Sequence, residues 1–166
     1  DPPCSAATLT PVSRDVEEIA IVETDCTVED PDGIQFERAI TDSFYRLHPD
    51  DYEFIFVFDT FDPQFSPGVG AYYAGIKNDV SGIGLPNLDS SSAWETEHHQ
   101  AIIHINQVGK LSPSDLDRSL PHELAHRWLA YASFMDGASR KPLFDVYRHW
   151  DYFLNTDGSF MGIAWR

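Results

Sequence analysis

The segment SLPHELAHRW, residues 119 to 128, contains two histidines and a glutamate at a spacing that could bind a metal ion and activate water. His122 and His126 are four residues apart, so on a helix they project from the same face about one turn apart. Two imidazole nitrogens so placed can reach one zinc ion at about 2.0–2.1 Å. Glu123 lies beside the first ligand, where it can accept a proton from metal-activated water. The spacing therefore predicts zinc-dependent hydrolysis.

A catalytic zinc site needs a third protein ligand and an open position. The candidates after the motif are Asp136, Asp145, His149, Asp151 and Asp157. His149 is the only histidine among them, and imidazole is a good zinc donor. We therefore expect His149 to complete the site, with Asp151 as the alternative. The competing interpretation of His149 is a packed residue in an aromatic cluster.

A carbonyl under attack develops negative charge, which needs a hydrogen-bond donor in addition to the metal. Tyr147 and Tyr152 flank His149 and could each supply a phenol, so both are candidate catalytic residues. Either tyrosine could equally belong to the core. Met161, which also follows His149, resembles the methionine beneath the zinc ion of metzincins, and simple packing is the alternative.

The segments before the motif alternate between strand and helix patterns. Strands are expected at 17–24, 53–61, 71–79 and 101–108, and a helix at 34–47, followed later by an irregular loop at 80–94. The helix has an apolar stripe formed by Phe36, Ile40, Phe44 and Leu47. The run EFIFVFDTF, at 53–61, suits a central strand that is covered on both faces.

The pattern from Ser112 to Phe134 is helical, but Pro121 removes an amide donor within it. We expect a short turn over 113–118 and then a main helix that begins near Ser119, with Leu120, Leu124, Trp128 and Tyr131 buried. A loop, a short helix over 142–152 and an extended tail should follow. Together the elements predict an α+β fold for residues 1–166 as one domain.

Composition excludes some functions. With 27 acidic and 11 basic residues the formal charge is -16, which argues against binding nucleic acid or an anionic membrane. No apolar run approaches the roughly 20 residues of a membrane helix. Oligomeric state cannot be predicted. The acidic segments EDPDG, DTFDP and NDVSG could bind calcium, although none matches the EF-hand pattern.

Two further features have competing interpretations. His98, His99 and His104 could form a second metal site, but neighbouring strand residues point to opposite faces, so a solvated loop and strand is preferred. A Cys4–Cys26 disulfide would tie an extended arm, residues 1–16, to the domain, with two buried thiols as the alternative. The cysteines and the start of the chain favour a secreted or periplasmic protein.

The HELAH motif, placed after several strands and a helix, resembles the zincin superfamily of metallopeptidases. The resemblance implies a small twisted mixed sheet with a backing helix and an active-site helix. It also implies that strand 101–108 is an edge strand that binds a peptide or protein substrate by strand addition. The segments HELAHRW and HWDYFLNTDGSFMG are similar to uncharacterised bacterial exported proteins with an HExxHRW segment.

The chain departs from the patterns of the best-known zincin branches. Leu129 stands where a metzincin has glycine, and no glutamate follows Glu123 as a gluzincin would require. The subfamily is therefore unassigned. The expected function is hydrolysis of peptide bonds with Glu123 as general base, and the alternative is a catalytically silent zinc-binding module. A fourth protein ligand in a closed site would favour that alternative.

Overall fold

The computed structural model describes residues 3–4, 12–17, 19–23, 27–28, 34–60, 70–105, 107–128, 131–144 and 149. Its helices are α1 (Ile34–Tyr45) and α2 (Pro113–Ala125), with short 3-10 turns at Ser91–Ala93 and Val108–Lys110. Its strands are β1 (Pro3–Cys4), β2 (Val12–Val16), β3 (Ile19–Glu23), β4 (Thr27–Val28), β5 (Phe54–Phe58), β6 (Ala71–Gly75), β7 (Lys77–Asn78), β8 (Leu88–Asp89), β9 (Ala101–Ile105), β10 (Ser133–Asp136) and β11 (Ser139–Pro142). The fold is α+β, as predicted.

The largest sheet has three strands in the order β5-β9-β6. Strand β9 runs parallel to β5 and antiparallel to β6, and all of its residues are buried. Among the described strands, β9 is central and β5 lies at an edge, so the predicted roles of these two strands are wrong. Phe56 and Phe58 of β5 are 38% and 45% exposed. A continuous apolar run does not distinguish a central strand from an edge strand that exposes one row of side chains.

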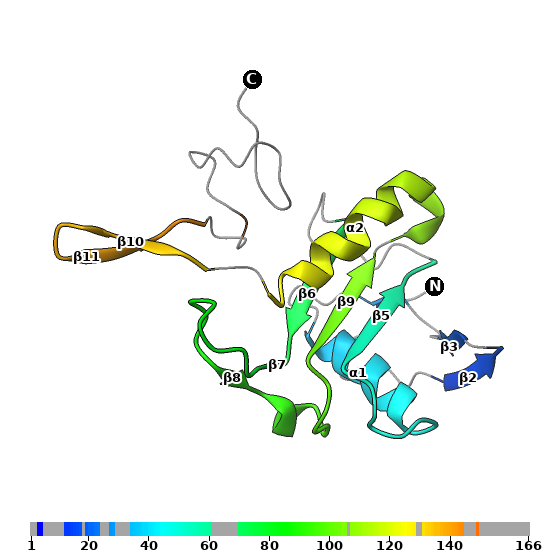
Figure 1. Cartoon of the computed structure of the whole chain (residues 1–166). Coiled ribbons are helices and arrows are strands. Elements are labelled where there is room, and N and C mark those ends of the chain that lie inside the picture. The colour runs from blue at the N-terminus through cyan, green and yellow to red at the C-terminus, as the bar shows by residue number, and fades with distance from the viewer. Residues whose placement is uncertain are drawn as a thin grey trace.

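The two helices lie on opposite sides of this sheet (Figure 1). Neighbouring residues of a strand point to opposite faces. On β9, His104 contacts Glu37 of α1, and its partner on β6 is Tyr72. The next residue of β6, Tyr73, has its ring 6.0 Å from that of His126 at the end of α2. One face of the sheet is thus covered by α1, and the other by α2.

Helix α1 forms close to its predicted position. Phe36 and Ile40 of the expected stripe are buried, and Phe44 is half-buried. Leu47 lies two residues beyond the end of the helix and is 54% exposed, so it does not extend the stripe.

Helix α2 is continuous from Pro113 to Ala125, so the predicted break before Pro121 is wrong. Ser112 caps the helix in a capping box with Asp115, which satisfies backbone donors at its start, and Pro113 occupies the first turn. Pro121 has no amide hydrogen, so the Asp117 carbonyl lacks its helical hydrogen-bond donor. Both residues are exposed, so water can reach that carbonyl.

The predicted buried stripe of α2 is only partly observed. Leu120 and Leu124 are half-buried, and Trp128 is 52% exposed. Tyr131 is buried but lies beyond the helix, which ends before residue 126.

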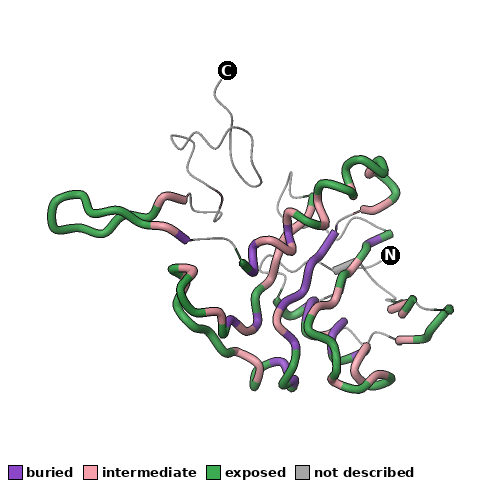
Figure 2. Tube along the Cα trace, in the orientation of Figure 1, coloured by how far each residue is buried: buried purple, intermediate pink, exposed green. Residues whose placement is uncertain are grey.

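A hairpin that the sequence interpretation missed follows α2. Strands β10 and β11 pair around the turn residues Gly137 and Ala138, and Gly137 has φ +61°. Glycine at the first turn position suits a two-residue hairpin loop. The hairpin projects from the sheet and is exposed along its length (Figure 2). Residues 142–144 and 149 are not helical, and the remainder of the expected helix at 142–152 lies outside the described residues.

Near the amino end, β2 and β3 form an antiparallel pair, and Cys4 of β1 pairs in parallel with Val28 of β4. Cys26 lies outside the described residues, so the Cys4–Cys26 disulfide stays a prediction. Neither described helix is long and apolar enough to cross a membrane.

Candidate metal centre

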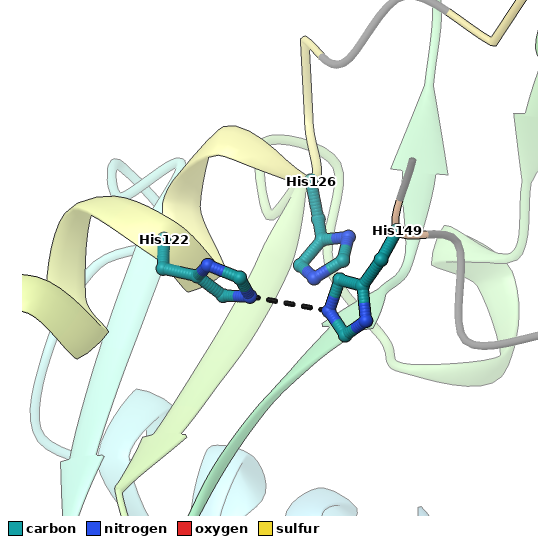
Figure 3. Close-up of side chains that lie close together, drawn as sticks. All are labelled: His122, His126 and His149. Atoms are coloured by element: carbon teal, nitrogen blue, oxygen red, sulfur yellow. Dashed lines mark hydrogen bonds between the residues drawn. The ribbon is translucent and has the colours of Figure 1, made fainter. Parts of the chain in front are cut away.

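Three histidines from two distant parts of the sequence converge at the end of α2. The ligand-type nitrogens of His122, His126 and His149 lie within 4.8 Å of one another. The Nε2 atoms of His122 and His149 are 3.1 Å apart (Figure 3). The three ring centroids are separated by 5.1 to 5.4 Å. The predicted third histidine therefore meets the pair on α2.

The donor set fits a metal ion. Two nitrogens bound at 2.0–2.1 Å to one tetrahedral zinc ion are separated by about 3.3 Å, close to the observed spacing of His122 and His149. Burial, and then the nearby charge of His149, lower the pKa of His122. A neutral imidazole keeps the lone pair that a metal requires. The structure therefore contains a possible metal site, and the donor set does not by itself identify the metal.

Glu123 is held beside this site with little solvent contact. It is 8% exposed, and its Oε2 atom lies 3.8 Å from Nε2 of His126, beyond hydrogen-bond distance. Burial raises the pKa of Glu123 to about 7. A carboxyl group with such a pKa can both accept and return a proton near neutral pH.

The other predicted site residues do not join the group. Asp136 lies in the exposed hairpin, where its carboxylate pairs with Lys141. The remaining candidates fall outside the described residues; they are Asp145, Tyr147, Asp151, Tyr152, Asp157 and Met161. The proposed phenol donors and aspartate ligands therefore stay predictions.

Tyr73 is a neighbour of the site that sequence interpretation missed. It lies on β6, on the face covered by α2, with its half-buried ring beside that of His126. Gly75 lies beneath this ring, since a Cβ there would approach Tyr73 Cε1 to 3.1 Å. The alternation in AYYAG assigns Tyr72 and Tyr73 to opposite faces but not to particular helices.

The histidines before α2 do not form a second metal site with one another. His98 is exposed and lies 3.7 Å from Asp50, whereas His99 is buried with its Nε2 atom 2.9 Å from the Ala101 carbonyl oxygen. Burial lowers the pKa of His99 to about 4. The interpretation of these residues as a solvated loop and strand is wrong for His99 and His104, which are fully buried.

His104 lies between two buried carboxylates on the α1 side of the sheet. Its Nδ1 atom is 2.5 Å from Glu37 Oε1, and its Nε2 atom is 2.6 Å from Asp59 Oδ2. Tyr72 also donates a hydrogen bond to Glu37. Burial alone would lower the pKa of His104, but hydrogen bonds to Asp59 and Glu37, together with their charges, raise it to about 9. His104 is therefore protonated near neutral pH.

The calcium prediction gains no support from the described residues, in which the three histidines are the only group with suitable ligand spacing. In NDVSG, the side chains of Asn78 and Asp79 accept hydrogen bonds from Arg127. In DTFDP, Asp59 is occupied by His104, and the second aspartate lies outside the described residues, as does EDPDG.

Comparison with known proteins finds no family model, no curated protein and no solved structure that matches this chain. The resemblance to zincins therefore depends on the HELAH motif of the sequence. The convergence of His149 with that motif is a separate, geometric observation.

Proposed function

We propose that this protein is a zincin-like zinc hydrolase that cleaves peptide bonds. One observation carries the proposal: His149 lies beside His122 and His126, although 22 residues of sequence lie between His126 and His149. Three histidines with an adjacent buried carboxylate are the ligand and base set of a catalytic zinc site that keeps an open position. A purely structural zinc site would need a fourth protein ligand.

Zinc bound by these histidines would polarise a substrate carbonyl and make water a stronger nucleophile at neutral pH. Glu123 would accept the proton from the attacking water and transfer it to the leaving amine. The residue is buried, so the carboxylate is shielded from bulk water. Burial on α2 also fixes the carboxylate next to the ligand His126.

The substrate position predicted from the sequence requires correction. Strand β9 pairs on both sides and cannot accept an added strand, whereas β6 pairs only with β9 among the described residues. Strand β6 also carries Tyr73, whose ring lies beside His126. We therefore place a peptide substrate along the outer edge of β6, where backbone amides and carbonyls can pair with it.

A Glu123→Gln variant tests the proposal, with zinc-loaded protein assayed against a mixture of unstructured peptides. Peptide cleavage should fall by about 10²–10⁴-fold, as expected for the loss of a general base, while zinc content stays at the wild-type level. Asp117→Asn on α2 is a matched control, since Asp117 is exposed, and it should leave cleavage unchanged.

Two outcomes would contradict this proposal. Cleavage by the Glu123→Gln variant at the wild-type rate would remove the glutamate from the mechanism. A wild-type protein that binds zinc but cleaves no peptide in the mixture would favour the silent zinc-binding module instead.

A further inference from the structure

The ligand His126 lies at a position where the helix gives it little support. It caps the C-terminal end of α2, where the regular ladder of hydrogen bonds has stopped. The amides of His126, Arg127 and Trp128 instead donate to carbonyls three residues earlier, at 3.2, 3.1 and 2.9 Å. Helix ends of this kind fray readily. A metal ligand at this position needs restraint from outside the helix.

Arg127, the next residue, provides such a restraint. Its side chain is buried, with the residue 5% exposed, and it reaches away from α2 to three acceptors. Nη1 donates to Asn78 Oδ1 at 2.7 Å. Nη2 donates to Asp79 Oδ1 at 2.7 Å and to Gln100 Oε1 at 2.9 Å.

Two of the three acceptors of Arg127 are themselves held in place. Asn78 donates from Nδ2 to the Pro86 carbonyl at 3.1 Å and accepts from the Val80 amide at 3.2 Å. The Gln100 carbonyl accepts from the amides of Ile76 and Lys77, at 2.9 and 3.0 Å. Arg127 therefore ties the end of α2 to the junction between β6, β7 and the start of β9.

A second contact restrains the backbone of His126. The buried Tyr131 donates from its hydroxyl to the His126 carbonyl at 2.8 Å. The backbone of Tyr131 is held against the loop between β7 and β8, since the Tyr131 amide donates to the Ile83 carbonyl. Gly84 allows this approach, because a Cβ there would lie 2.2 Å from the Tyr131 carbonyl oxygen.

We propose that Arg127 is a positioning residue for the metal site, which fixes the ligand His126 by anchoring the end of α2 to Asn78, Asp79 and Gln100. Tyr131 assists by holding the His126 carbonyl. The planar guanidinium group suits this role, because it presents several donors in a rigid fork, whereas lysine offers a single flexible ammonium group. The inference rests on the proposed metal site but not on peptide hydrolysis.

The test measures zinc affinity of the full chain by competition with a chromophoric chelator. Arg127→Lys keeps the charge and removes the fork, and it should weaken zinc binding by about 10–100-fold, the usual effect of losing a residue that orients a ligand. Arg118→Lys is the matched control on the exposed part of α2 and should change affinity by less than about twofold. Wild-type affinity in Arg127→Lys would overturn the inference.

Tyr131→Phe is a second variant that removes only one hydroxyl, so it keeps the test decisive if Arg127→Lys does not fold. It should weaken zinc binding by severalfold without loss of folded protein, and an unchanged affinity in a folded Tyr131→Phe protein would count against the inference. The visible absorption of the cobalt-loaded protein gives a further readout, because a shifted ligand changes the band intensity and a remote loss of stability does not.

Two results separate positioning from a general structural effect. If Arg127 acts through His126, Arg127→Lys should have no further effect on zinc affinity in a His126→Ala background, and a persistent effect there would overturn the inference. A wild-type protein that binds zinc without cleaving peptides leaves the inference standing and removes only the peptidase. Failure of the wild type to bind zinc overturns both.

Discussion

The two faces of the central sheet place histidines in different surroundings. On the α2 face, His122, His126 and His149 turn their nitrogens toward one another. On the α1 face, His104 is enclosed by Glu37 and Asp59. The pKa of His122 is lowered by burial and the neighbouring His149, whereas carboxylates raise the pKa of His104 to about 9.

This difference separates a ligand from a structural residue. A neutral histidine that faces other histidines has lone pairs to share, so a cation stabilises the group. A protonated histidine between carboxylates has donated both of its N–H groups and cannot bind a metal. His104 instead connects β9 to α1 and to Asp59 at the end of β5. The two clusters should therefore respond differently to substitution.

The largest expected effect is on the stability of the α1 face. His104→Ala leaves Glu37 and Asp59 buried without their shared cation, and removal of one partner of a buried ion pair costs about 3–5 kcal/mol. Chemical denaturation should show this loss in the free energy of unfolding at pH 7. Under conditions in which His104→Ala is folded, it should bind zinc with wild-type affinity. His98→Ala, at an exposed position, is the control for the loss of stability. A loss below about 1 kcal/mol would contradict the role of the cluster.

The next effect is on metal binding at the α2 face. His126→Ala should lower zinc affinity by about 100–1000-fold, because a total zinc-binding free energy of about 10–16 kcal/mol is shared among three or four ligands. The free energy of unfolding of the metal-free protein should change much less in His126→Ala than in His104→Ala. Isothermal titration with zinc measures the zinc affinity, and chemical denaturation measures the free energy of unfolding. Unchanged zinc affinity would erase the distinction between the two faces.

The smallest effect is the pH dependence of stability. Hydrogen bonds and carboxylate charges raise the folded-state pKa of His104 to about 9, above its ordinary value of 6.5. Its stabilisation is therefore complete below about pH 6.5 and is lost as the pH rises through 9. At 1.36 kcal/mol per pKa unit, the loss is on the order of 3 kcal/mol. The polar groups that contact it include Glu37, Asp59 and Tyr72.

Denaturation at several pH values between 6 and 10 checks this prediction. The difference in unfolding free energy between the wild type and His104→Gln isolates the histidine from the other groups that titrate in this range. The difference should shrink as the pH rises. A difference that stays constant would show that the pKa of His104 is the same in the folded and unfolded protein, which would contradict the prediction.

The sequence was sufficient to predict that His122 and His126 share one face of a helix, because the HELAH spacing is itself a geometric statement about a helix. His149 could be selected because no other histidine follows the motif. Helix α1 was predicted from its periodic apolar residues, which is a local property. Each of these predictions needed no knowledge of which strands are neighbours.

The α1 face could not be predicted, because it depends on contacts between distant residues. Glu37, Asp59 and His104 lie in separate elements, and nothing in their local sequence indicates that they meet. The exchange of central and edge strands has the same cause, since strand order is not encoded in the pattern of one strand. The predicted break of α2 before Pro121 was an error of another kind. Ser112 and Asp115, which cap the continuous helix, have the spacing of a capping box in the sequence itself.

The central claim, a metal site formed by three histidines, is tested most directly by titrating the metal-free wild type with zinc in competition with a chromophoric chelator, in parallel with His149→Ala. The proposal predicts saturation at about one zinc per chain in the wild type and much weaker binding in the variant. A wild type that takes up no stoichiometric zinc would contradict it. Binding unaffected by His149→Ala would exclude His149 as the third ligand.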